Sequence, residues 1–142
     1  MSSEGRDRIA ASLARAAGID ASAKQIGDAV VGVCRELDSA LTPVLGRRGG
    51  GALYKRSLHL VAAAHPWLPS VAEDLQTAMD LEPLHHAMAR QTSADAVAAG
   101  ADLLQTFHDL LSGLVGASLT ERLLRSVGSP FSSGPPGQDT PR

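Results

Sequence analysis

Five side chains that can contact an anion cluster around a run of three glycines. They are Arg47, Arg48, Lys55, Arg56 and His59. Glycine lets a backbone approach an anion closely, and the helix expected after Gly51 would present unpaired N–H groups and partial positive charge at its N-terminus. Cations are unfavourable in such a first turn, so an anionic partner would relieve their cost. We interpret these five residues as a candidate surface for an acidic protein partner. A flexible, solvated basic loop is the alternative interpretation.

The glycine run does not match a nucleotide-binding loop. Gly46 and Gly51 have the four-residue gap of a P-loop, but Ala52 and Leu53 follow where Lys and then Ser or Thr are required. No strand is expected before the run either. The sequence therefore gives no reason to expect a nucleotide at this position.

His59 is expected on the exposed side of a helix, one turn after Lys55. An accessible imidazole with a nearby cation and small neighbours is suited to accepting a phosphoryl group from a partner's phospho-aspartate. As a small helix bundle with such a histidine, the chain resembles histidine phosphotransfer domains. The resemblance implies that His59 would be phosphorylated. The family carries Lys-Gly three and four residues after its histidine, however, where this chain has Ala62 and Ala63. An ordinary surface histidine is the alternative.

Glu82 and His85 have the Glu-x-x-His spacing that places two ligands on one helical face in di-iron bundles. Such a site needs a second copy of the motif. The residues three positions before the other candidate histidines are Arg56, Ala62 and Gln105. Pro83 lies inside the motif and favours the start of a helical turn, and the adjacent His86 would point about 100° away from His85. We expect no metal ion and no cofactor.

Two further side chains with reactive potential are expected in the core. Cys34 lies beside Val30 on an apolar helix stripe, where burial would raise its pKa and leave it as inert packing. His108 lies beside Leu111, and we expect a core histidine hydrogen-bonded to a carbonyl group. The sequence holds no Gly-x-Ser-x-Gly, His-Glu-x-x-His or Ser-x-x-Lys motif. We therefore assign no catalytic residue, although an enzyme is not excluded.

The elements that carry these residues are expected to be helices, because the sequence contains helix-start signals and no strand pattern. In each signal a hydroxyl caps a backbone N–H and an acid or amide follows three residues later. The signals begin at Ser22, Ser70, Thr92 and Ser118. We expect helices over about 4–17, 22–43, 52–64, 70–90 with an interruption at Pro83, 92–116 and 118–127, with a loop over 46–51.

Apolar residues at steps of three and four predict which helix faces are buried. The stripes include Ile9 and Leu13; Ile26, Val30, Val33, Leu37, Leu41 and Val44; Leu53, Ser57, Leu60, Val61 and Ala64; and Leu103, Leu104, Phe107, Leu110, Leu111, Leu114 and Val115. The fold class predicted is all-α, a four- to five-helix antiparallel bundle over residues 1–127. The Pro-, Gly- and Ser-rich tail over 128–142 is expected to be disordered.

Composition limits the function classes. The 142 residues carry 13 basic and 15 acidic side chains, a formal net charge of −2, which argues against bulk capture of nucleic acid or an anionic membrane. No apolar run approaches the ~20 residues of a membrane span, and we expect no secretory signal. A single cysteine fits a reducing cytoplasm. The scarcity of aromatic residues is compatible with a homodimer that covers leftover apolar surface.

These observations favour a non-enzymatic, cytoplasmic interaction or regulatory module of bacterial-type signalling. Its working surface would be the five residues around the glycine run. Two other functions remain open, namely phosphotransfer at His59 and the binding of a small ligand in an apolar cavity between helices.

Overall fold

The computed structural model describes residues 3–18, 20, 22–68 and 81–125. All regular structure within these ranges is helical, which confirms the all-α prediction. The helices are α1 (Ser3–Ala17), α2 (Ala23–Val61), α3 (Glu82–Ala89), α4 (Ser93–Val115) and α5 (Ala117–Arg125). The helix start expected at Ser70 and the tail over 128–142 lie outside the described residues. None of the described helices is long and apolar enough to cross a membrane.

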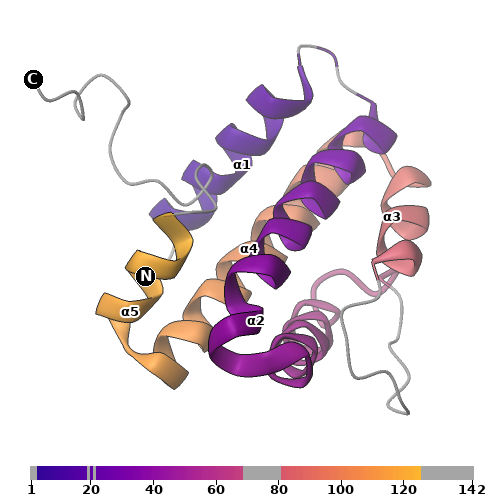
Figure 1. Cartoon of the computed structure of the whole chain (residues 1–142). Helices are drawn as coiled ribbons and strands as arrows, with labels where there is room; N and C mark the ends of the chain where they lie inside the picture. Colours follow the sequence, from indigo (N-terminus) through magenta and orange to yellow (C-terminus); the bar gives the residue numbers. More distant parts are fainter. Residues whose placement is uncertain (1–2, 19, 21, 69–80, 126–142) are drawn as a thin grey trace, which may run out of the picture.

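Helix α4 is the central element, as its broad apolar face predicts. It packs against α1, α2 and α5, while α3 packs on α2. Figure 1 shows α1 running antiparallel to the first part of α2, with α4 lying along both. The most buried side chains of α4 are apolar and close-packed against these neighbours, and they include Leu103, Leu104 and Leu111.

Two of the predicted helix starts are confirmed by hydrogen bonds. At Ser22 the capping box is complete, because Gln25 N donates to Ser22 Oγ over 3.2 Å and Ser22 N donates to Gln25 Oε1 over 2.8 Å. At Thr92 the hydroxyl accepts from Asp95 N over 3.1 Å. The prediction at Ser118 is wrong. Helix α5 begins at Ala117, directly after the positive-φ residue Gly116, so Ser118 lies inside the first turn.

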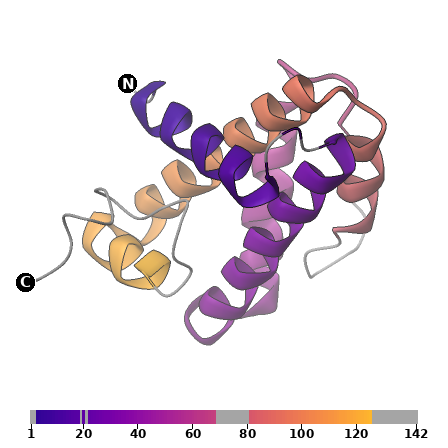
Figure 2. The ribbon, with the colours of Figure 1, turned by 90° about the horizontal axis from the view of Figure 1, so that it is seen from above.

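The expected loop over residues 46–51 is also wrong, because the chain reverses within α2 at a single residue. Gly46 has φ 78° and ψ 168°, and helical backbone continues on both sides of it, through Pro43 before and through the other glycines after. This conformation is essentially restricted to glycine. Figures 1 and 2 show the resulting sharp bend. A Cβ added at Gly49 would lie 2.7 Å from Leu45 Cβ, so the reversal also needs a small residue one turn later.

The core follows the predicted stripes with four exceptions, each at an exposed position, and one of them is Ala64 in the turn after α2. Leu60 is 43 % exposed, since residues 47–61 bury Tyr54, Leu58 and Val61 and Leu60 points about 100° away from Val61. Val44 and Leu114 are 46 % and 60 % exposed. Each lies two residues before a positive-φ glycine, at the end of a helical segment where fewer neighbours cover a side chain.

Candidate functional site

The second part of α2, residues 47–61, carries a strip of exposed basic residues. Arg48, Arg56 and His59 are exposed and Lys55 is half-buried, and we call these four residues the basic face. Ala52 lies between Arg48 and Arg56, and Ala63 lies one turn after His59. Both alanines are exposed, so the strip is continuous along one side. Arg47 belongs to the same helical segment, but its side chain is not among those described.

The helix that carries the basic face begins earlier in the chain than the sequence predicted. Helical backbone resumes at residue 47, not at residue 52, because Gly46 alone forms the break. Arg47 and Arg48 therefore occupy the first turn, where the helix dipole opposes them. Lys55 and Arg56 lie about two turns further along, where that effect has faded.

Charge segregation along the chain reinforces the basic face. Four basic residues and no Asp or Glu lie between Asp38 and Glu73, in a chain whose formal net charge is −2. The local excess of positive charge is thus concentrated on the segment that exposes Arg48 and Arg56. A surface of one sign attracts a partner of the opposite sign and speeds its association.

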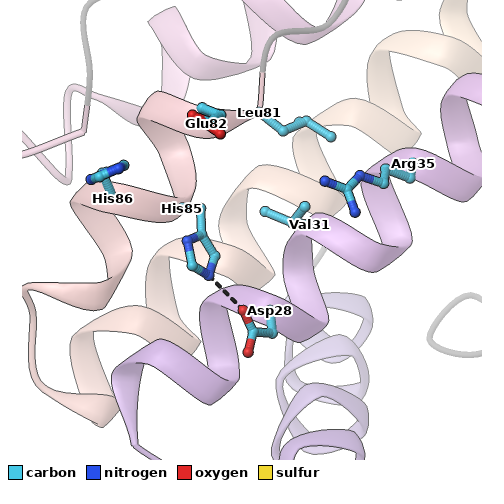
Figure 3. Close-up of a pocket in the computed structure, with 7 residues that line it drawn as sticks. All are labelled: Asp28, Val31, Arg35, Leu81, Glu82, His85 and His86. Carbon is cyan, nitrogen blue, oxygen red and sulfur yellow. Dashed lines mark hydrogen bonds and ion pairs between the residues drawn. The ribbon is translucent and has the colours of Figure 1, made fainter.

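A second site lies between α2 and α3 and was not predicted from the sequence. It is a cavity of about 380 Å³ lined by Asp28, Val31, Arg35, Leu81, Glu82, His85 and His86. Figure 3 shows Arg35 extending from α2 toward Val31 and Leu81, and His85 reaching from α3 toward Asp28. The side chain of His86 points away from α2 (Figure 3). Pro83 lies in the first turn of α3, as expected, and Glu82 and His85 also lie in its first turns.

Asp28 and His85 form the contact that joins the two walls of this cavity. His85 Nε2 lies 2.5 Å from Asp28 Oδ1, and Lys24 Nζ lies 3.7 Å from Asp28 Oδ2. Because an ionised carboxylate only accepts hydrogen bonds, the imidazole must be the donor. The hydrogen bond from His85, with the charge of Lys24, lowers the pKa of Asp28 below its ordinary value of 3.8, although burial opposes the shift.

Within the Glu-x-x-His motif, His85 thus forms a hydrogen bond with Asp28 and Glu82 lines the same cavity. Among the described residues, no group of three or more His, Cys, Asp and Glu side chains is arranged to hold a metal ion. The Asp28–His85 contact joins residues 57 positions apart. No local spacing signals such a pair, so it could not be predicted from the sequence.

A second Asp–His pair was also missed. His65 Nε2 lies 2.7 Å from Asp102 Oδ2, and the His65 ring meets the Trp67 ring edge-on with centroids 6.1 Å apart. This pair fastens the turn after α2 to the middle of α4.

The two residues expected in the core have different outcomes. Cys34 is buried, which confirms its predicted place in the core, and burial raises the pKa of its thiol to about 12. His108 is not a core histidine, because 35 % of its side chain is exposed and its Nδ1 lies 3.5 Å from Asp109 Oδ1. Its position at the margin of the apolar stripe of α4 explains the difference.

No protein-family model, no curated protein and no solved structure matches the chain.

Proposed function

We propose that the chain is a non-enzymatic interaction module that binds an acidic protein partner through the basic face of residues 47–61. The observation that carries the proposal is the exposure of Arg48, Arg56 and His59 on one side of a segment that contains no acidic residue. An acidic surface opposite this strip would meet complementary charge along several helical turns. The net charge of −2 for the whole chain favours a protein partner over nucleic acid.

The proposal includes a regulatory role in bacterial-type signalling in the cytoplasm. The single cysteine supports a reducing compartment, since Cys34 is a buried free thiol. The glycine break supports a docking role, because Gly46 holds the basic segment as a rigid helix instead of a solvated loop. A preorganised surface loses less conformational entropy on binding than a loop does.

The test is a charge reversal on the full chain. A partner captured by the wild type and identified by cross-linking is purified, and its affinity is measured against Arg48→Glu/Arg56→Glu. We expect affinity to fall at least about tenfold, with a smaller dependence on salt, because exposed charges act through screened electrostatics. The matched control is Arg15→Glu/Arg90→Glu, which reverses two exposed arginines on α1 and at the end of α3. Equal affinity of the two double variants would exclude the basic face.

A second candidate function is phosphotransfer at His59, favoured by the exposure of its imidazole and of Ala63 one turn later. In this reaction an acyl phosphate would lose its phosphoryl group to the imidazole nitrogen, and the partner's carboxylate would leave. Incubation with acetyl phosphate would then give an acid-labile gain of one phosphoryl group. The gain should be absent in His59→Gln and retained in His86→Gln, a second exposed histidine.

A homodimer is a further part of the proposal. Leu114 is 60 % exposed near the end of α4, and a second copy of the chain would remove this apolar surface from water. Light scattering after size exclusion should show a dimer that Leu114→Glu converts to monomer. A monomeric wild type would remove this part and leave the basic face untouched.

A further inference from the structure

The cavity between α2 and α3 is lined by one hydrogen-bonded pair of side chains and by two further charged side chains of opposite sign. Asp28 and His85 are hydrogen-bonded to each other, and Lys24 also neutralises Asp28. Arg35 and Glu82 line the same cavity. Both residues are exposed, and within the described parts of the chain neither side chain makes a hydrogen bond or an ion pair.

The two remaining charges come from opposite walls. Arg35 lies on α2 and Glu82 is the first residue of α3. Figure 3 shows the Arg35 guanidinium ending near Val31 and Leu81, with Glu82 beyond Leu81. Two apolar side chains, the buried Val31 and the half-buried Leu81, line the cavity together with these charges. A ligand that pairs with both charged side chains and also contacts Val31 and Leu81 needs an anionic group, a cationic group and a short hydrocarbon body.

We propose that this cavity binds a small amino carboxylic acid with an aliphatic body. Its carboxylate pairs with the Arg35 guanidinium, whose planar fork fits carboxylate geometry. Its ammonium group pairs with Glu82, and its hydrocarbon part covers Val31 and Leu81. The cavity volume of about 380 Å³ lies at the small end of the range for ligand pockets. This site is independent of the basic face and of any partner bound there.

Singly charged and doubly anionic ligands fit the cavity less well. A dicarboxylate or a phosphate ester would place negative charge near Glu82 and Asp28 as well as near Arg35. An amine alone would leave Arg35 unpaired, and a carboxylate alone would leave Glu82 unpaired. Since hydrogen bonds to charged groups are among the stronger ones in proteins, each missing group should weaken binding measurably.

The test compares two zwitterions with their singly charged analogues on the full chain. Calorimetry with L-leucine and 5-aminopentanoate distinguishes an α-amino from an ω-amino ligand. The analogues are 4-methylpentanoate, which lacks the ammonium group, and pentylamine, which lacks the carboxylate. We expect at least one zwitterion to bind at millimolar concentration or below, and both analogues to bind about tenfold more weakly or not at all.

Two variants locate the site. Arg35→Gln and Glu82→Gln should each lower the affinity for the bound zwitterion about tenfold. Arg15→Gln and Glu121→Gln, exposed residues on α1 and α5, should leave it unchanged. Circular dichroism of each variant excludes loss of folding as the cause. The proposal is overturned if neither zwitterion binds, if an analogue binds as tightly as its zwitterion, or if the site variants behave like the controls.

Discussion

Nε2 of His65 lies 2.7 Å from Oδ2 of Asp102, across 37 positions of sequence. The two side chains are only 14 % and 25 % exposed, so the contact is largely shielded from water. It links the turn that follows α2 to the central helix α4. Beside it lies Trp67, the only tryptophan of the chain. The pair therefore sits next to a natural fluorescent reporter.

We expect the His65–Asp102 contact to contribute about 1.5–3 kcal/mol of coupling energy, as a hydrogen bond to a charged group does. A double-mutant cycle with His65→Ala and Asp102→Ala measures this coupling through urea unfolding followed by Trp67 fluorescence. The more exposed pair of His108 and Asp109, 3.5 Å apart, serves as the comparison and should give a much smaller value. Additive effects of His65→Ala and Asp102→Ala would contradict the prediction.

The contact between Asp28 and His85 predicts a dependence of stability on acid pH. Folding lowers the pKa of Asp28 below 3.8, chiefly through the hydrogen bond from His85. A carboxylate whose pKa is lowered in the folded state stabilises that state above its unfolded pKa, and the contribution disappears as the pH falls through the folded pKa. Asp28→Asn should thus lower the free energy of unfolding near neutral pH but have progressively less effect below pH 3.8.

Urea titrations of the wild type and Asp28→Asn over a series of pH values provide the measurement. His85→Ala supplies the control background, because Asp28→Asn should then change stability much less at every pH. If Asp28→Asn has the same effect at neutral and at strongly acid pH, the folded-state pKa of Asp28 is not lowered and the prediction fails.

Gly100 marks the closest approach of α4 to its neighbours. A Cβ at this position would lie 2.7 Å from Val30 Cγ2 and 3.2 Å from Leu13 Cδ1, both on fully buried side chains. Overpacking of this kind costs about 1–3 kcal/mol, partly offset by the better helix propensity of alanine. We expect Gly100→Ala to lower the free energy of unfolding by about 1 kcal/mol.

Gly32→Ala is the matched control for Gly100→Ala. Gly32 lies within α2, and a Cβ there would have no neighbour within 4 Å. This substitution should raise stability by about 0.5–1 kcal/mol through helix propensity. Thermal unfolding of the two variants should therefore shift in opposite directions, and shifts of the same sign would show that α4 does not pack against Val30 as closely as described.

Cys34 should react only when the chain opens. Its thiol is buried and its pKa is raised to about 12, so almost no thiolate is present near pH 8. A disulfide reagent should label the native protein slowly and the urea-unfolded protein at once. Rapid, complete labelling under native conditions would contradict the burial of Cys34.

The sequence was sufficient to predict the fold class and the helix ends that depend on local chemistry. Gly18 follows the end of α1, Ser22 caps α2 and Thr92 caps the central helix, because capping uses residues a few positions apart. The reversal at Gly46 was missed for the opposite reason. A run of glycines favours a loop locally, and packing of the two parts of α2 against the core overrides that preference.

The candidate sites also differ in whether local sequence patterns could predict them. The exposure of Arg56 and His59 follows from helical periodicity, and it agrees with the structure. Their role in binding stays a prediction. The pair of Asp28 with His85 and the cavity around it depend on how α3 docks on α2, and no spacing rule relates positions so distant in the sequence.

The break at Gly46 also determines how the chain could exchange segments between copies. Alanine at this position would disfavour φ 78° and favour an uninterrupted helix over Ala23–Val61, whose 39 residues would span about 58 Å. The two parts of α2 could then no longer fold back within one molecule. Each would complete the core of a second chain, so adding Gly46→Ala to the monomeric Leu114→Glu variant should give a domain-swapped dimer, detectable by light scattering after refolding at high concentration.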